Sequence, residues 1–473
     1  MWKEYINATS IEQVLNVLAE KGPSARIIVG GTDLVLEMGR GMRSEVETLL
    51  DISRVPGFDR ITVDEKDRIH LGPTVTHNHV LASPIIRKYA SPLAQASWEV
   101  GSPQLRNMAC IAGNLVTASP ANDTISPLMA MGAKLVLSSK GGDRSVNLKD
   151  FYTGVRKTIL RPDEMISDIS FPKLEDNQHG SFLKLGLRQT MIISVVDVTV
   201  LLTLSGDVVQ EASITLGAVA PTIIPVPQAE EYLIGKKLTQ ENIQEAARLA
   251  RESASPIDDI RGSAAYRRQM TSVLVKRGLR EIRSGEAGER VPENPVLLGD
   301  LRPVKSTPGL TGKPMVQGET PIRTTINGKE HVFEEGHDDT LLHLVRDQAG
   351  LVGSKVGCEE GECGSCTMFL DGRAVLSCMI PAPRAHHAQI VTIEGLSEGE
   401  DLHPLQESFI AEGAVQCGYC TPGFIMSGAK LLEEKPDPSR TEIVDAITGN
   451  LCRCTGYYKI IKAIEEASQK EGE

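Results

Sequence analysis

The chain has 473 residues, 41% of them hydrophobic, and carries a formal net charge of −12. This length predicts several domains, because single hydrophobic cores stop growing at roughly 250–300 residues. The acidic balance argues against a nucleic-acid partner, since no basic field attracts phosphates. No window reaches the ~20 apolar residues of a membrane helix, and the start lacks a signal-peptide run, so we expect a cytoplasmic protein without membrane contact.

Short apolar runs alternate with helical patterns from the start to about Arg283. Ser10-Ile11-Glu12-Gln13 predicts a capping box that opens a helix. Strands are expected at residues 27–29, 134–138 and 195–204, and helices at 241–254 and 263–280. The alternation indicates a mixed α and β fold in this half of the chain.

A glycine loop, Gly30-Gly31-Thr32-Asp33, directly follows the first expected strand, which ends at Val29. Glycine lets backbone N–H groups close on phosphate oxygens, so this loop could hold a diphosphate. A plain tight turn explains the same residues. No G-x-G-x-x-G opens this half, so a Rossmann fingerprint is not available.

The segment from Gln104 to Asp123 gathers small residues, amide side chains and one carboxylate within 20 positions. Such groups are typical of the lining of a bound polar cofactor rather than of a core. Cys110 in this segment is expected to be a small buried residue, with a redox role as the alternative. His77 and His79 precede it, and we expect them to be structural, with a functional role as the alternative.

A stretch without hydrophobic periodicity, Gly285–Pro321, holds six prolines and six glycines. It cannot bury enough apolar surface to order itself, so we predict a linker, either free or pinned along a domain surface. After it, Asn327-Gly328 between two alternating runs predicts a β-hairpin over 322–333. Helices are expected at 341–349, 405–411, 423–433, 441–448 and 459–468.

Eight of the nine cysteines lie in the last 120 residues, in two sets of four. The first set, spaced C-x4-C-x2-C-x11-C, is Cys358, Cys363, Cys366 and Cys378. The second, spaced C-x2-C-x31-C-x-C, is Cys417, Cys420, Cys452 and Cys454. Four thiolates are the ligand count of one [2Fe–2S] cluster, and the first spacing is the plant-type pattern, so the chain is expected to carry electrons.

Zinc is the alternative metal, because it also takes four cysteines. Zinc sites favour paired C-x2-C knuckles, and the first spacing is not one. The second set is less decisive by itself, since C-x2-C with a distant C-x-C could hold zinc. Disulfides are disfavoured by the cytosolic interpretation.

The two sets, in this order, resemble the small iron–sulfur subunit of the molybdenum hydroxylases, the family of xanthine dehydrogenase and carbon monoxide dehydrogenase. The stretches that carry the resemblance are Gln416-Cys417-Gly418-Tyr419-Cys420-Thr421-Pro422-Gly423 and Gly449-Asn450-Leu451-Cys452-Arg453-Cys454-Thr455-Gly456-Tyr457. The resemblance implies that the second set is the one nearer the molybdenum. Gln416 and Cys417 would then lie close to the pterin.

The glycine loop and the 104–123 segment resemble, in the same order, the FAD-binding subunit of that family. Met108, Ala109 and Ala112 depart from the family's usual residues, which affects the local loop contacts. The resemblance implies that FAD is bound by Val29, Gly30, Gly31, Thr32, Asp33, Cys110, Ile111, Gly113, Asn114, Asp123, Ile166 and Lys184.

The implied fold is α+β and multidomain. A PCMH-type FAD-binding domain would span 1–175, a flavin C-terminal subdomain 176–284 and the linker 285–320. A β-grasp, plant-type [2Fe–2S] ferredoxin domain would span 321–396, and a four-helix [2Fe–2S]-binding domain 397–473.

The implied function is that of an oxidoreductase, the electron-transfer subunit of a xanthine dehydrogenase-like enzyme. A large partner chain would hold molybdopterin and oxidise the substrate, so no residue of this chain is expected to be catalytic. Single electrons would pass from the second set to the first and then to FAD, which exchanges one or two electrons. The flavin-first order is consistent with a fusion of two small subunits, and we expect a dimer of heterodimers.

A self-contained flavin and iron–sulfur reductase is the main alternative, and a redox sensor or scaffold is the non-enzyme alternative. The motif around Gln416 argues against a reductase, which has no use for a pterin contact. The sequence leaves the substrate open among purines, N-heterocycles, aldehydes and carbon monoxide. It also leaves the terminal electron acceptor open.

Overall fold

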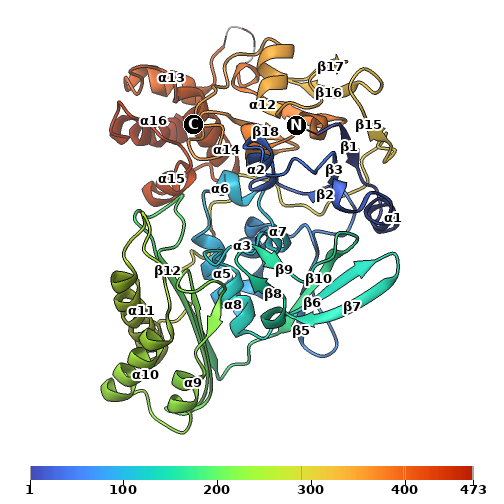
Figure 1. Ribbon diagram of the computed structural model, residues 1–473. Helices are drawn as coiled ribbons and strands as arrows, with labels where there is room; N and C mark the ends of the chain where they lie inside the picture. The colour runs from blue at the N-terminus through green and yellow to red at the C-terminus, as the bar shows by residue number, and fades with distance from the viewer. Residues whose placement is uncertain (1, 289, 398, 400, 471–473) are drawn as a thin grey trace. The chain divides into compact units, whose positions relative to one another are not determined.

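A computed structural model describes residues 2–470 apart from residues 289, 398 and 400 (Figure 1). The chain forms two compact units that do not follow the order of the sequence. The first unit comprises Met1–Phe58, Gly101–Ala109 and Val296–Glu473, and the second comprises Asp59–Val100 and Cys110–Pro295. The short segment Gly101–Ala109 therefore belongs with the cysteine-rich part of the chain.

The first unit begins with a small, mainly parallel sheet. Its strands, in spatial order, are β15 (Pro314–Met315), β1 (Glu4–Asn7), β3 (Thr48–Asp51) and β2 (Ala25–Ile28), with helices α1 (Ile11–Lys21) and α2 (Leu34–Gly39). Ser10 caps α1 by accepting a hydrogen bond from the Gln13 N–H, 3.3 Å away. The Gln13 side chain accepts from Thr9 N rather than from Ser10, so only half of the expected capping box forms.

The proline-rich stretch divides between the two units, and from Val296 onward it is pinned along the first unit. β15 pairs with β1 in antiparallel register, Tyr5 opposite Met315. Val296 and Leu298 are buried in a hydrophobic cluster with the helices near the carboxyl end. The Glu434 carboxylate accepts hydrogen bonds from Leu297 N and Leu298 N. A few buried apolar side chains are enough to order this part of the stretch, because neighbouring elements also form hydrogen bonds with its backbone.

A second sheet of the first unit has the order β17-β16-β20-β18-β19. The predicted hairpin is confirmed: β16 (Ile322–Ile326) and β17 (Lys329–Phe333) pair antiparallel. Asn327 and Gly328 both have positive φ, 51° and 76°, as a two-residue hairpin turn requires. The other strands are β18 (Thr367–Leu370), β19 (Arg373–Leu376) and β20 (Gln389–Val391), and a short helix α12 (Leu341–His343) continues as a π-helical turn, Leu344–Gln348.

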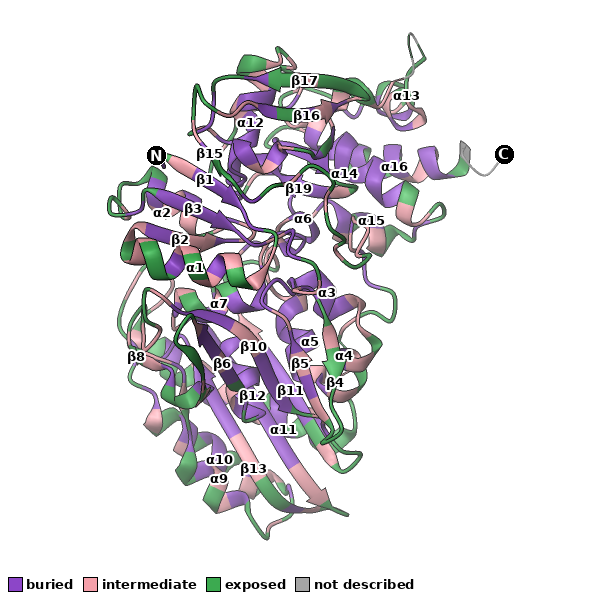
Figure 2. Ribbon diagram, turned by 90° about the vertical axis from the view of Figure 1, so that its right-hand side faces the viewer, coloured by how far each residue is buried: buried purple, intermediate pink, exposed green. Residues whose placement is uncertain are grey.

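Four helices complete the first unit: α13 (Pro404–Ala411), α14 (Thr421–Glu434), α15 (Arg440–Ala446) and α16 (Tyr458–Lys470). They lie close to the predicted positions. α14 is buried along most of its length, as its purple ribbon in Figure 2 shows. Phe424 on α14 packs edge-to-face against Tyr457, with ring centroids 6.0 Å apart.

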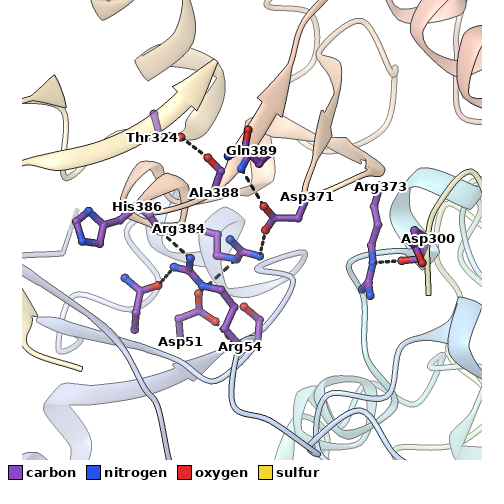
Figure 3. A network of polar contacts seen from close by, with 12 residues as sticks. Asp51, Arg54, Asp300, Thr324, Asp371, Arg373, Arg384, His386, Ala388 and Gln389 are labelled. Atoms are coloured by element: carbon purple, nitrogen blue, oxygen red, sulfur yellow. Dashed lines mark hydrogen bonds and ion pairs between the residues drawn. The ribbon is translucent and has the colours of Figure 1, made fainter. Parts of the chain in front are cut away.

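A buried ionic network joins the two sheets of the first unit (Figure 3). Arg384 donates to the Asp371 carboxylate at 2.9 Å and lies 3.7 Å from that of Asp51. Arg54 donates to the His386 carbonyl at 2.6 Å. Burial lowers the pKa of the Arg54 guanidinium to about 10 and that of His386 to about 4. Removing one member would leave a buried charge without its partner.

The second unit contains two antiparallel sheets. The first sheet consists of β4 (Ile61–Val63), β5 (Arg68–Leu71), β10 (Met165–Pro172), β6 (Lys134–Ser139) and β7 (Gly142–Asn147). It shares a core with helices α3 (His77–Ala82), α4 (Pro84–Tyr89), α5 (Ser91–Trp98), α7 (Ile111–Thr117) and α8 (Ile125–Ala130). A two-stranded ribbon, β8 (Tyr152–Gly154) with β9 (Lys157–Thr158), lies apart from both sheets.

The other sheet of the second unit consists of β11 (Gln178–Leu185), β12 (Val196–Ser205), β13 (Val208–Gly217) and β14 (Ile224–Pro225). Helices α9 (Pro227–Leu233), α10 (Gln240–Ser253) and α11 (Ala264–Ser284) share its core. Separate helices and antiparallel strands agree with the expected α+β multidomain class. Within the described residues, no helix is both long and apolar enough to cross a membrane.

Candidate cofactor sites

The first cysteine set lies on the β-rich part of the first unit. Cys358, Cys363 and Cys366 occupy the loop before β18, and Cys378 follows β19. The Sγ of Cys358 accepts hydrogen bonds from Glu360 N at 3.4 Å and Glu362 N at 3.2 Å. Hydrogen bonds from the Cys363 and Cys378 thiols favour the thiolate form of Cys358 and lower its pKa.

Glycine is required where the loop folds tightly around sulfur. A Cβ at Gly357 would lie 2.5 Å from the Cys363 Sγ, closer than real Cβ atoms come. A Cβ at Gly364 would lie 2.4 Å from the carbonyl oxygen of Gly449. The backbone therefore approaches the ligand sulfurs without intervening side chains.

The second set lies at the ends of helices. Cys417 and Cys420 precede the body of α14, and Cys452 and Cys454 precede α16. The Sγ of Cys452 accepts from Thr455 Oγ1 at 3.1 Å, Thr455 N at 3.3 Å and Cys454 N at 3.4 Å. Burial raises the pKa of the Cys420 thiol to about 12. Side-chain contacts pair Cys417 with Cys454 and Cys420 with Cys452.

Both sets fit binuclear iron–sulfur ligation. All nine cysteines lie in the described part of the chain, and none of them forms a disulfide. Each set brings four thiols together from separate stretches, with N–H groups directed at a sulfur. Among the described residues, no three His, Cys, Asp or Glu side chains surround a point suited to a single metal ion. Four thiols per set match the four protein ligands that two sulfide-bridged irons need.

The glycine loop of the first unit connects β2 to α2. A Cβ at Gly30 would lie 2.1 Å from the carbonyl oxygen of Met108, and one at Gly31 would lie 2.5 Å from that of Met379. Gly31 also has a positive φ of 69°. Both glycines are thus required by close backbone approach, and the loop packs directly against the residue after the ligand Cys378. Val29 and Thr32 are half-buried and Asp33 is exposed.

The second unit places Asp123 and Lys184 in direct contact. Lys184 Nζ donates to Asp123 Oδ2 at 2.6 Å and to the carbonyl oxygen of Glu99 at 3.0 Å. Ser194 Oγ donates to the other Asp123 oxygen at 2.5 Å. Asp197 faces Lys184 across the β11–β12 pair and is fully buried. Burial, and then the charge of Asp123, raise the pKa of Asp197 well above its ordinary value.

Cys110 serves as the N-cap of α7. Its Sγ accepts a hydrogen bond from Gly113 N at 3.3 Å. Asn114, one turn along, accepts through Oδ1 from Thr124 Oγ1 at 2.6 Å. Ile111 and Ile166 are buried in the hydrophobic cluster of the same unit. The interpretation of Cys110 as a small buried residue agrees with its 7% exposure.

Two histidines and two amides in the cofactor-like stretches have structural contacts. His79 completes the cap of α3 by accepting from Thr76 N at 3.1 Å, and His77 Nδ1 lies 3.4 Å from Ser97 Oγ. Asn107 Nδ2 donates to the carbonyl oxygens of Leu297, Leu298 and Ala374, at 3.0, 3.0 and 3.1 Å. Gln104 is buried among residues of the four-helix part, where its Nε2 donates to Ser427 Oγ and Asn450 Oδ1. Periodicity could not reveal these distant partners.

Four known sequence families match the chain in succession. Residues 2–174 match the FAD binding domain in molybdopterin dehydrogenase, and residues 181–282 match the CO dehydrogenase flavoprotein C-terminal domain. Residues 324–387 match a 2Fe-2S iron-sulfur cluster binding domain, and residues 392–465 match a [2Fe-2S] binding domain.

The nicotine 6-hydroxylase small subunit of Paenarthrobacter nicotinovorans is 44% identical over 151 residues, 32% of this chain and 91% of that protein. The nicotinate dehydrogenase small FeS subunit of Eubacterium barkeri is 44% identical over 149 residues, 32% of this chain and 95% of that protein. The chain belongs to the molybdenum hydroxylase family. Its cofactors are accordingly FAD and two [2Fe–2S] clusters, and it resembles the electron-transfer subunits of these oxidoreductases.

A solved structure of the family also resembles this chain. A chain of carbon monoxide dehydrogenase from Hydrogenophaga pseudoflava has a TM-score of 0.57 at 29% identity, covering 60% of this chain and 98% of that chain. This chain is therefore longer than either of these two nearly completely matched polypeptides.

Proposed function

We propose that this chain passes electrons from the molybdopterin centre of a large partner subunit to FAD and a terminal acceptor. The second cysteine set would receive each electron and the first set would pass it on. When bound, FAD supplies the exchange of one or two electrons. The residues of this chain supply sulfur ligands, hydrogen bonds to sulfur and fixed positions, which tune the potentials of such sites.

The exposure of the second set is the observation that carries this proposal. Cys417 and Cys454 are exposed, whereas Cys366 and Cys378 are only 3% and 4% exposed. Exposed apolar side chains flank the second set, namely Val415, Tyr419 and Leu451. Apolar side chains around an exposed ligand are suited to contact with another protein. Gln416, our proposed pterin neighbour, is exposed beside them.

The flavin contacts are proposed for each unit separately. In the second unit, Asp123 and Lys184 form an ion pair whose side chains are 8% and 3% exposed, supported by Ser194. We propose this pair as flavin contacts, together with Cys110, Ile111, Gly113, Asn114 and Ile166 of the same unit. In the first unit we propose Val29–Asp33 as a diphosphate contact.

Membership of the family also supports proposals about the substrate, the location, the assembly and the domain bounds. We propose an N-heterocycle, a purine or an aldehyde as the substrate of the partner, and two relatives are named for nicotine and nicotinate. We also propose a cytoplasmic location, a dimer of heterodimers, and domains at 1–175, 176–284, 321–396 and 397–473 joined by a linker at 285–320.

Purification of the complex from its native host tests this proposal. We expect a large molybdenum-containing chain to co-purify, with FAD and four irons per copy of this chain, the content of two binuclear clusters. The complex should turn over at least one member of a panel of N-heterocycles, purines and aldehydes. A lone chain that is fully active as a nicotinamide-dependent reductase would contradict the proposal, and so would zinc in place of iron.

A further inference from the structure

The two cysteine loops touch through their backbones within the first unit. Leu451, the residue before the ligand Cys452, donates its N–H to the carbonyl oxygen of the ligand Cys363 at 3.0 Å. A Cβ at Gly423 would lie 2.2 Å from the carbonyl oxygen of Gly364, so a larger residue does not fit there. One hydrogen bond therefore links the backbones of a first-set ligand and of the neighbour of a second-set ligand.

Asn450 adds a second link at the same place. Its side-chain Nδ2 donates to the carbonyl oxygen of Gly364 at 3.2 Å. Its Oδ1 accepts from Ser427 Oγ at 2.9 Å and from Gln104 Nε2 at 3.1 Å. Because Oδ1 receives these donors, the Asn450 amide is oriented with its N–H group toward Gly364.

Gln104 orders this cluster from outside the iron–sulfur part of the sequence. It lies on α6 (Pro103–Arg106), within the stretch that matches the FAD-binding family. Its Nε2 also donates to Ser427 Oγ at 2.8 Å, and the side chains of Gln104 and Ser427 are fully buried. A Cβ at Gly449 would lie 2.5 Å from Gln104 Oε1, so the segment fits only against glycine.

We infer that Gln104 is a positioning residue for electron transfer between the two cysteine sites. It acts through Asn450, which holds the Gly364 loop against the Asn450–Leu451 segment and so fixes the separation of the two ligand sets. The inference rests on the proposed order of transfer from the second set to the first. The step moves one electron from the reduced second site to the oxidised first site, with no bond made or broken.

The structural consequence is that a segment of the flavin half is built into the iron–sulfur relay. Functional groups must be held to within about 0.5 Å by surrounding residues whose own positions are locked by hydrogen bonds. Loss of the Gln104 amide would leave Ser427 as the remaining side-chain donor to Asn450 and would let the loop contact loosen.

The substitution Gln104→Met tests the inference, because methionine keeps the approximate length and volume of the side chain and removes the amide oxygen and nitrogen. Gln13→Leu is a control: it breaks a side-chain contact to the Gly312 carbonyl in the same unit and touches neither cysteine loop. Both variants are prepared as the full chain in its native complex. Iron content and the EPR g-values of each reduced site show whether both clusters are present.

The decisive measurements are the magnetic splitting between the two EPR signals and the rate of electron transfer from the second site to the first in a single turnover. We expect Gln104→Met to keep both signals, to reduce the splitting and to slow transfer several-fold, because electron tunnelling falls off exponentially with the separation of the two sites. Gln13→Leu should behave as wild type. Wild-type splitting and rate in a fully iron-loaded Gln104→Met variant would overturn the inference while leaving the relay itself intact.

A second variant keeps the test decisive if Gln104→Met loses iron. Ser427→Ala removes one of the two donors to Asn450 Oδ1 and also the hydroxyl that accepts from Gln104 Nε2, and it leaves the direct contact between Gln104 and Asn450 in place. We then expect a smaller reduction of the splitting at full iron content. An unchanged splitting in Ser427→Ala would overturn the inference in that case. Absence of the second signal in the wild-type protein would instead contradict the proposed function.

Discussion

The two cysteine sets have equal numbers of ligands but opposite surroundings. The first set is embedded: Cys366 and Cys378 belong to a hydrophobic cluster that also contains Leu344 and Met379. The second set is peripheral, with Cys417 and Cys454 exposed at the ends of helices. Exposure and hydrogen bonds to sulfur tune the potential of an iron–sulfur site, so identical ligation can give two different electron carriers. The first set is therefore held by the hydrophobic core of its unit, whereas the exposed cysteines of the second set are accessible to another protein.

Replacing one ligand from each set should give the largest difference in thermal stability between two variants. We expect Cys378→Ser to abolish the first cluster and to destabilise the first unit, because a buried hydroxyl without a partner costs about 1–3 kcal/mol in addition to the lost metal ligation. Cys454→Ser should abolish only the second EPR signal and retain the fold. Iron content, EPR and thermal unfolding measure both. An equal loss of thermal stability in the two variants would contradict the embedded–peripheral contrast.

The buried ionic network of the first unit tests how far the stability of that unit depends on buried contacts (Figure 3). Arg384→Met would remove the ion pairs that Arg384 makes with Asp371 and the buried Asp51, and we expect a loss of about 3–5 kcal/mol in the free energy of unfolding. Arg302→Met is the control, since Arg302 is 87% exposed and its loss should change stability by less than about 0.5 kcal/mol. Denaturant unfolding followed at the first cluster's absorbance is the measurement. Similar midpoints for the two variants would show that the network does not stabilise the fold.

The second unit contains none of the eight proposed cluster ligands, and there the buried carboxyl group of Asp197 should make stability depend on pH. Its pKa is raised above the ordinary 3.8 by burial and by Asp123, with Lys184 and Ser126 as its other polar neighbours. Between pH of about 4 and the raised pKa, the folded chain holds a proton that the unfolded chain has released. The free energy of unfolding therefore falls as pH rises through this window, by about 1.4 kcal/mol per unit of pKa shift.

The substitution Asp197→Asn should remove this decline. Melting temperatures of the wild type and the variant, measured from pH 5 to pH 8, should diverge as pH rises, with the variant the less pH-sensitive. The EPR signals of both cysteine sites should stay unchanged. Parallel pH profiles would mean that Asp197 is ionised in the folded chain.

Thr455→Val should give the smallest effect and is specific to the second set. It removes the 3.1 Å hydrogen bond from Thr455 Oγ1 to the Cys452 sulfur. Such a bond stabilises the more negative reduced state, so the potential of the second site should fall by about 40 mV, the equivalent of about 1 kcal/mol for one electron. Redox titration by EPR measures both sites in one sample. The potential of the first site is the internal control, and a shift of both sites together would point to a general structural change.

Much of this arrangement could be predicted from local patterns. The C-x4-C-x2-C spacing identifies the ligand loop, and Asn327-Gly328 identifies the hairpin turn that the structure shows. The helices α10 and α14 begin and end within two residues of their predicted bounds. The capping box at Ser10 was predicted in full but only half forms, because the Gln13 side chain has a competing partner at Thr9.

The sequence by itself determined the chemistry of this protein, because ligand number, ligand spacing and turn residues are local properties that residues a few positions apart express. Tertiary structure alone decided where those parts meet. The pairing of β15 with β1, the contact of Gly31 with Met379 and the placement of Gln104 beside Asn450 each join residues more than 300 positions apart. No periodicity encodes such contacts, since they arise only when separately folded segments pack together and satisfy each other's buried polar groups.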